Sequence, residues 1–385
     1  MLIPVLVLCS FAVATAEFVL VGLLPQVAAD LSVSVPAAGQ LVTAYMLVVT
    51  VAGPVATVLT RRLPRRGLLV ATMALATAAA GVSATAGSYG VLLAARLGSA
   101  LAQALFMAVA SQVAMAAAPP GRQTAAVARV FAGFALATVI GLPLGVLAAD
   151  VRGWHASFVL VAVLAGAGLL GVVAFCPPVP APEASGRGSL RAVTDPAVLH
   201  GLLITLLALT GFVTAFTYVA PTLRSVSGFG PLGVSLALIA YGAGTVAGTA
   251  LAGRVVPARI LGVLPVAVGA LAAVLLAQRV LLPYRPAAVT GLVVLGCAAF
   301  VVVPLVQTWL MGTAGPRSAG LVASVNISVA GLAGALGAGL GGAVLSGLGP
   351  AWIGPVAAVP VLVATAVALT LRRRTVPVPV GDLAA

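Results

Sequence analysis

Two residues of opposite charge lie inside long apolar stretches of this sequence. Glu17 is the only charged residue between Leu2 and Leu24, and Arg96 lies in the otherwise uncharged segment ARLGSALAQALF. A charge at the centre of a bilayer costs roughly 2.5–3.5 kcal/mol on insertion scales, so each of these residues needs a partner or a function. Burial disfavours the charged form of a carboxylate, and a nearby cation favours it. A carboxylate whose surroundings change can therefore load and unload a proton, which is what a proton carrier requires.

The depths of the two charges match. If the first apolar stretch ends near Leu24, Glu17 lies roughly 10 Å below one membrane surface. A later stretch begins near Gly90 on the same side and places Arg96 roughly 9 Å deep. We therefore expect both to face one polar cavity, in direct contact or linked through water. The alternative is that Arg96 extends to the lipid headgroups and Glu17 stays protonated and without function.

The composition is that of an integral membrane protein. The chain has 385 residues, of which 62% are hydrophobic and 6% charged, and its mean hydropathy is +1.25. No soluble fold of this size can bury so much apolar surface. All 19 basic residues are Arg, and the net charge is +13. Because these Arg residues cluster between apolar stretches, they indicate membrane topology rather than a nucleic-acid partner.

Division at charges and at Pro/Gly clusters predicts twelve membrane spans. They cover 3–24, 37–59, 67–86, 90–116, 124–148, 155–175, 198–221, 232–252, 259–279, 286–311, 319–345 and 351–371. The first stretch could also be a secretory signal peptide, but it lacks a positive n-region and is long enough to span. We interpret it as a retained first span.

A polar, Pro-rich segment divides the spans into six and six. We expect an N-terminal bundle over 1–176, a cytoplasmic linker over 177–197, a C-terminal bundle over 198–372 and a short cytoplasmic tail over 373–385. The halves echo each other, since TRRLPRR follows the second span and GRVVPAR follows the eighth. The fold class is therefore all-α, with two pseudo-symmetric six-helix bundles that suggest duplication.

The distribution of Arg predicts that both termini are cytoplasmic. With the N-terminus inside, the loops and tail on that side carry thirteen Arg and the opposite loops carry four. The four are Arg152, Arg224, Arg279 and Arg285. Cytoplasmic loops are the ones enriched in Arg and Lys.

Polar and aromatic residues within the spans are candidates for a substrate cavity. They are Tyr45, Gln103, Phe106, Gln112, Tyr218, Tyr241, Gln307, Trp309 and Asn326. Together they describe a mostly apolar site with few polar anchors, which suits an apolar solute. Each could instead serve only helix packing.

The fifth span combines glycines with a proline. Gly141 and Gly145 allow a neighbouring helix to approach closely, and Pro143 removes a hydrogen bond and favours a kink. Such a helix suits a transporter whose halves rock, although ordinary tight packing explains it too.

Enzyme signatures are missing from the sequence. There is no lysine and hence no Walker A motif, and neither HExxH nor GxSxG occurs. The cysteines have no metal-binding spacing. We expect no catalytic residues, no metal and no cofactor, with a proton gradient as the energy source.

Over nearly its whole length the sequence resembles the major facilitator superfamily. It is most similar to the twelve-span drug:proton antiporters, on the branch of chloramphenicol-resistance and arabinose/sugar-efflux proteins. The segments that carry the resemblance are TAEFVLVGLLPQVAADLSVS, GQLVTAYMLVVTVAGPV, ARLGSALAQALF, GWHASF, FTYVAPTL and ASVNISVAGLAGALG. The resemblance implies alternating access, with Glu17 and Arg96 as the proton-coupling residues.

One loop departs from the family pattern G-x-L-A-D-R-x-G-R-R. The corresponding segment VLTRRLPRRG has Arg61 at the position of the Asp and Pro64 at that of the Gly. The gating network is therefore not carried over intact, and its candidates here are the four Arg of the loop. These are Arg61, Arg62, Arg65 and Arg66.

The function expected is proton-coupled export of a small, largely apolar antibiotic or metabolite. We expect a monomer in a bacterial cytoplasmic membrane, whose partners are protons, lipid and the cargo. The alternatives are a sugar efflux or uptake permease of the same fold, or a non-transporting membrane protein such as a sensor.

Overall fold

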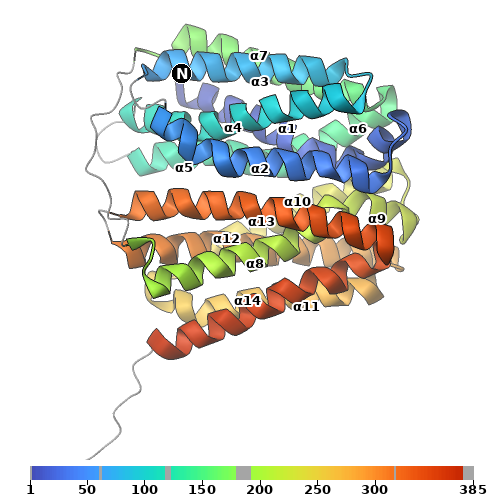
Figure 1. Cartoon of the computed structure of the whole chain (residues 1–385), viewed down its shortest axis with the longest axis vertical. Helices are drawn as coiled ribbons and strands as arrows, with labels where there is room; N and C mark the ends of the chain where they lie inside the picture. The colour runs from blue at the N-terminus through green and yellow to red at the C-terminus, as the bar shows by residue number, and fades with distance from the viewer. Residues whose placement is uncertain (1, 60–62, 118–122, 179–191, 316–317, 376–385) are drawn as a thin grey trace, which may run out of the picture.

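The computed structural model describes residues 2–59, 63–117, 123–178, 192–315 and 318–375. Twelve of its helices are long and apolar enough to cross a membrane. Figure 1 shows them lying side by side in two groups, one from each half of the chain. The predicted all-α fold with twelve spans is confirmed.

The helices of the first half follow the predicted spans, with one interruption. They are α1 (Leu2–Asp30), α2 (Val35–Leu59), α3 (Arg65–Ala84), α4 (Tyr89–Ala117), α5 (Gln123–Leu136), the π-helical turn η1 (Ala137–Gly141), α6 (Leu142–Arg152) and α7 (Trp154–Phe175). The π-helical turn ends at Gly141, two residues before Pro143, which lies in the first turn of α6.

The second half repeats this arrangement. It contains α8 (Pro196–Thr217), α9 (Val219–Ser225), α10 (Pro231–Gly253), η3 (Pro257–Arg259), α11 (Ile260–Leu281), α12 (Arg285–Ala314), α13 (Ala319–Gly347), η4 (Pro350–Trp352) and α14 (Ile353–Thr375). Asp195 caps α8 by accepting a hydrogen bond from the Ala197 amide at 2.8 Å. The predicted span over 198–221 is broken at Tyr218, which lies between α8 and α9.

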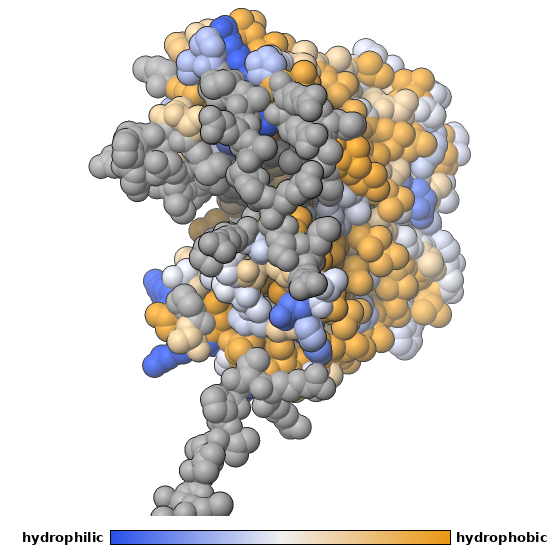
Figure 2. Space-filling model, turned by 60° about the vertical axis from the view of Figure 1, so that its left-hand side comes forward, coloured by the Kyte–Doolittle hydropathy of each residue, from blue (hydrophilic) through white to orange (hydrophobic). Residues whose placement is uncertain are grey.

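Two ends of the molecule can be distinguished. The terminal end carries the beginning of α1 and the end of α14, and the distal end carries Asp30, Asp150 and Arg224. The exterior between them is apolar, with Leu170 71% and Val266 68% exposed. Figure 2 shows a large hydrophobic area on this exterior, as expected for a surface that faces lipid.

The two halves meet along two seams of small residues. On one, Gly331 and Gly334 of α13 lie against Thr50 and Met46 of α2. On the other, Gly242 of α10 lies so close to η1 that an added Cβ would come within 2.7 Å of the Val139 Cα. Glycine allows these backbones to approach because it has no side chain.

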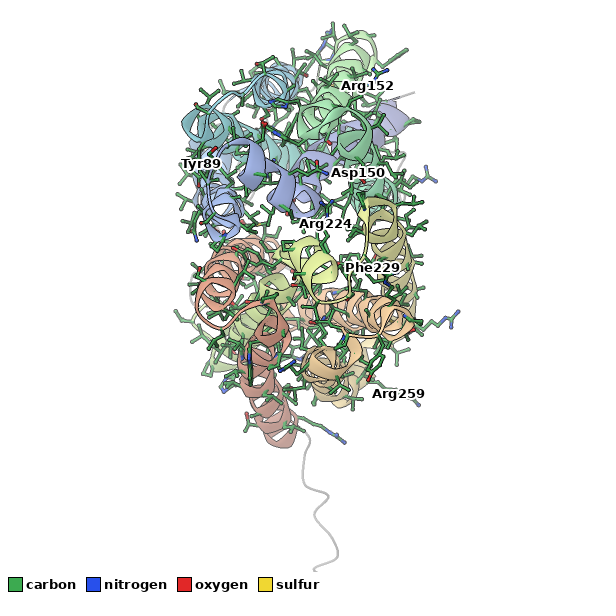
Figure 3. All side chains as sticks on the ribbon, turned by 90° about the vertical axis from the view of Figure 1, so that its right-hand side faces the viewer. Tyr89, Asp150, Arg152, Arg224, Phe229 and Arg259 are labelled. Carbon is green, nitrogen blue, oxygen red and sulfur yellow. The ribbon has the colours of Figure 1, made fainter. Side chains whose placement is uncertain are left out.

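A charged pair joins the halves at the distal end. Arg224 of α9 lies 3.7 Å from Asp150 of α6, and Asp150 also accepts a hydrogen bond from the Gln26 side chain of α1 at 2.8 Å. Figure 3 looks onto this end and shows Asp150 and Arg224 close together at the boundary of the halves. On the terminal side, Figure 2 shows a hollow between the halves. The halves are thus joined by a charged pair at the distal end, beside a pocket of about 720 Å³ lined by residues of both halves, and are hollowed towards the termini.

Within the second half, Gly248 tests how tightly the helices are packed. A Cβ at this position of α10 would overlap the Cys297 carbonyl oxygen of α12, and a backbone atom cannot rotate away. We expect Gly248→Ala to lower the stability by roughly 1–3 kcal/mol, as overpacking does. Thermal unfolding of the purified protein in detergent measures this.

Gly253→Ala is the matched control, because no atom lies within 4 Å of an added Cβ there. It should leave the melting temperature unchanged or raise it slightly. Equal melting temperatures for the two variants would contradict the packing described here.

Candidate functional site

Glu17 lies at the centre of a hydrogen-bonded chain that joins three helices. Its side chain on α1 is 9% exposed, and its carboxylate Oε2 accepts a hydrogen bond from Nε2 of Gln103 on α4 at 2.5 Å. The Oε1 atom of Gln103 in turn accepts a hydrogen bond from the Tyr45 hydroxyl on α2. Gln103 thus uses both ends of its amide, and the carboxylate is held by an uncharged donor.

Arg96 binds the backbone of α1 rather than the Glu17 carboxylate. It is 1% exposed and donates hydrogen bonds to the carbonyl oxygens of Ala16 and Glu17, the latter at 3.4 Å. Its guanidinium also lies 4.2 Å from the centroid of the Tyr45 ring, in a cation–π contact. Burial of a cation is costly unless the charge is stabilised, as it is here by carbonyl oxygens and an aromatic face.

Among the described residues no direct ion pair joins the Arg96 guanidinium and the Glu17 carboxylate, and a link through water in a shared cavity stays a prediction. The Arg96 guanidinium and the Glu17 carboxylate are linked through the side chains of Tyr45 and Gln103. Arg96 and Gln103 are seven residues apart on α4, which puts both on the face that meets α1. Arg96 therefore reaches the backbone of α1, and Gln103 reaches the Glu17 carboxylate on the same helix.

The helix that carries Glu17 is longer than the predicted span. The helix does not end at Leu24 but continues through Pro25 to Asp30. Glu17 is therefore thirteen residues, or roughly 20 Å, from the distal end of α1. Asp30, the other carboxylate of this helix, lies at the distal end and accepts a hydrogen bond from the Trp154 indole at 2.9 Å.

The broken fifth span packs against the helix that carries Glu17. Side chains at Gly141 and Gly145 would overlap Thr15 and Val19 of α1. The same side of α5 contributes Gly133, where a Cβ would overlap the backbone of α1. The predicted close helix approach is present, and Pro143 adjoins the π-helical turn.

Three predicted cavity residues take no part in the described hydrogen bonds around Glu17. Phe106 packs in the apolar core of the first half, and the buried side-chain oxygen of Gln112 has no hydrogen-bond donor among the described residues. Tyr218 lies at the boundary of the halves, where its hydroxyl contacts Gly39 and donates to the Ala338 carbonyl at 3.1 Å.

The second half contains an uncharged polar group built from three helices. The Thr205 hydroxyl of α8 donates to the Asn326 side chain of α13 at 2.7 Å, and Asn326 donates to the Gln307 side chain of α12 at 2.5 Å. Trp309 packs against Gly201 of α8. The pattern indicated Asn326 and Gln307, but Thr205 became apparent only from the structure.

A group of aromatic rings was missed by the sequence analysis, apart from Tyr241. Its members lie within the spans of both halves and contact one another. They are Phe18, Phe134, Phe212, Phe216, Tyr241 and Phe300. The position of Phe18 directly after Glu17 was the one available signal.

The Arg-rich loop can be placed only in part. Arg61 and Arg62 lie outside the described residues. Arg65 is buried at the start of α3, and Arg66 donates to the Val173 carbonyl of α7 at 2.9 Å. Their gating role stays a prediction.

No group of three His, Cys, Asp or Glu able to hold a metal ion occurs among the described residues.

The sequence model of the family described as Major Facilitator Superfamily matches residues 6–338 of this chain. The chain belongs to this superfamily. The chloramphenicol resistance protein of Streptomyces lividans is 36% identical over 373 residues, which cover 95% of this chain and 94% of the relative. The inner membrane transport protein YdhP of Escherichia coli K12 is 34% identical over 333 residues, or 86% of this chain and 85% of the relative.

Solved structures show the same fold. A D-xylose-proton symporter aligns with a TM-score of 0.77 at 13% identity, covering 96% of this chain and 97% of the other. A bacterial homologue of the human lysosomal transporter Spinster, in an inward-facing and occupied conformation, aligns with a TM-score of 0.77 at 16% identity and 96% coverage of both chains. The chain is thus a multi-pass membrane transporter of the major facilitator fold.

Two variants of Tyr45 separate its hydroxyl from its ring. Tyr45→Phe removes the donor to Gln103 but keeps the aromatic face under Arg96. We expect it to lower the free energy of unfolding by about 1 kcal/mol. Tyr45→Leu removes the hydroxyl and the aromatic ring and leaves the buried cation poorly stabilised. We therefore expect a larger decrease in the free energy of unfolding, about 2–4 kcal/mol. Thermal unfolding in detergent measures the difference, and equal losses would show that the cation–π contact contributes nothing.

Proposed function

We propose that this transporter exports a small, largely apolar antibiotic or metabolite in exchange for protons. The observation that carries the proposal is the Glu17 carboxylate, which is buried midway along α1 and bound by the neutral Gln103 amide. A carboxylate held in this way can lose or gain its charge when its surroundings change. The name of the Streptomyces lividans relative, a chloramphenicol resistance protein, supports export of a drug-like molecule.

The hydrogen-bonded chain suggests how a proton at Glu17 would act on the rest of the molecule. An amide donates a stronger hydrogen bond to an ionised carboxylate than to a protonated one. Protonation therefore loosens the bond between Glu17 and Gln103, and with it the attachment of Tyr45. Tyr45 belongs to α2, which packs against α13 of the other half, so the change reaches the seam between the halves.

The proposed direction follows from the predicted topology. If the termini are cytoplasmic, the hollow on the terminal side opens to the cytoplasm and the Asp150–Arg224 pair joins the halves on the outer side. Cargo enters from the cytoplasm as Glu17 releases its proton there. After the halves rock, cargo leaves and Glu17 is protonated from outside.

A single carboxylate limits the stoichiometry and the charge of the cargo. Glu17 lies midway along its helix, whereas Asp30 and Asp150 lie near distal helix ends. We therefore propose about one proton per cycle and a preference for neutral or singly charged cargo. One charge moved through 100 mV is worth about 2.3 kcal/mol, which sustains a roughly 50-fold solute gradient.

Glu17→Gln keeps the shape of the side chain but removes its charge and its exchangeable proton. We expect it to abolish efflux driven by a pH gradient while leaving cargo binding measurable. The assay compares efflux of chloramphenicol and related apolar antibiotics from an efflux-deficient host, together with proton release in proteoliposomes.

Asp30→Asn is the matched control, because it neutralises the other carboxylate of the same helix, at its distal end. It should retain most of the efflux. Normal pumping by Glu17→Gln would show that the proton is carried elsewhere, and robust transport of dications by the unaltered protein would contradict the proposed cargo charge.

A sugar permease is the second candidate, favoured by the uncharged polar group of the second half. Thr205, Asn326 and Gln307 supply amide and hydroxyl groups that could bind sugar hydroxyls. Counterflow in proteoliposomes preloaded with arabinose or with chloramphenicol separates the two. We expect preloaded chloramphenicol, and not preloaded arabinose, to accelerate uptake of labelled chloramphenicol. Accelerated uptake of labelled arabinose into arabinose-loaded proteoliposomes would establish the alternative.

A further inference from the structure

The pocket at the distal end lies between the two halves, apart from the hollow on the terminal side. Its walls come from α1 and the start of α2 in the first half, and from α9, α13 and η4 in the second. Its volume of about 720 Å³ lies within the range of small-molecule sites, about 300–1,000 Å³. A molecule in this pocket would contact both halves at once.

Most of the lining is apolar. It includes four proline rings, at Pro25, Pro36, Pro221 and Pro350, and the side chains of Val35 and Leu345. Because a proline ring fixes its own φ angle, these walls are rigid before any ligand arrives. Apolar walls of this kind favour a ligand with a compact hydrocarbon body.

The walls of the two halves are held against each other at the buried side chain of Tyr218. Its hydroxyl contacts Gly39 of α2 and donates a hydrogen bond to the Ala338 carbonyl of α13 at 3.1 Å. Tyr218 lies three residues before the lining residue Pro221, and Gly39 lies three residues after the lining residue Pro36. The pocket therefore has a fixed shape in this arrangement of the halves.

The charged side chain among the described lining residues is Arg224, which lies at the boundary of the halves (Figure 3). Its distance of 3.7 Å to the Asp150 carboxylate is long for a charge-assisted hydrogen bond, which is typically about 2.7–2.9 Å. The buried Nε and Nη2 atoms of Arg224 find no hydrogen-bond acceptor in the described part of the chain. Such donors are costly to leave unpaired. The long side chain is 25% exposed, and a small rotation towards the pocket would present them to an acceptor.

The serine hydroxyls of the lining differ in what they can still offer. Those of Ser225 and Ser346 already donate to carbonyl oxygens of their own helices, each at 2.8 Å. Ser34 is exposed and accepts a hydrogen bond from the Ala37 amide at 3.2 Å, which leaves its own proton to donate. The lining thus supplies a cation and a hydroxyl donor beside apolar walls, which suits an anionic group.

We propose that this distal pocket binds an anionic small molecule with a compact hydrocarbon body, whose carboxylate is held by Arg224. The site goes beyond the proposed export function and does not depend on it. The hydrocarbon body lies against the proline rings, and the carboxylate gives Arg224 the close, charge-assisted hydrogen bonds that it lacks with Asp150. Because the bound molecule contacts both halves, it stabilises the arrangement in which their distal ends are together.

The test compares an acid with its amide. Purified full-length protein is titrated at pH 7 with adamantane-1-acetate and with adamantane-1-acetamide, which share one hydrocarbon body and differ in charge. The shift of the melting temperature at increasing concentration gives each affinity. We expect the acid to bind about tenfold more tightly, because hydrogen bonds between charged groups are the stronger ones.

Arg224→Gln should weaken binding of the acid to the level of the amide, while the amide binds within about threefold of its original affinity. Arg152→Gln is the matched control, because Arg152 is an exposed arginine at the distal end of α6 that does not line the pocket. It should keep the preference for the acid. Ser346→Trp fills the pocket from an exposed position of α13 and should abolish binding of both compounds, which keeps the test decisive if Arg224→Gln fails to fold.

Glu17→Gln should keep the preference for the acid whether or not it pumps, so failure of this site and failure of the export function are told apart. Equal binding of acid and amide, or binding of neither, would overturn the distal site. A preference that survives both Arg224→Gln and Ser346→Trp would place the acid elsewhere on the molecule. A preference that Arg152→Gln also removes would show only a general attraction of the distal face for anions, and would overturn the site as well.

Discussion

The structure of the first half depends on how the buried charge of the Arg96 guanidinium is stabilised. In a membrane, a buried polar group must find its partners inside the protein. Arg96 finds two backbone carbonyls of α1 and the face of Tyr45 on α2. These contacts bind α1, α2 and α4 together. They also leave the Glu17 carboxylate to a neutral partner, Gln103, rather than to a cation.

The helix α1 connects this polar centre to both halves of the molecule. On one side the glycines of the broken fifth span allow a close approach, because a side chain at Gly141 or Gly145 would overlap α1. On another, Phe18 reaches the second half through its ring contact with Phe216. Adjacent residues of one helix thus carry a buried carboxylate and an aromatic contact across the boundary. A transporter that rocks about this boundary would move both together.

Particular residues show how far the sequence could be interpreted. Arg96 and Glu17 were grouped by depth, and the structure links them only indirectly, through Tyr45 and Gln103. The depth argument could not give the partner atoms, because Arg96 selects backbone carbonyls, which every residue carries. Pro143 and its flanking glycines indicated a distorted, closely packed helix, and the structure has a π-helical turn there. The ion pair of Asp150 and Arg224 had no signal, since its members are 74 residues apart.

The sequence by itself determined the membrane class, the twelve spans and the residues too polar to face lipid, because hydropathy and the cost of burying a charge are local properties of the chain. Only the tertiary structure decided which of these residues meet. The route from Arg96 to Glu17 through Tyr45 and Gln103, the group of Thr205, Asn326 and Gln307, and the ring contact between the halves all join helices distant in sequence. Helix rotation and helix neighbours are set by the packing of the whole molecule, so no local pattern contains them.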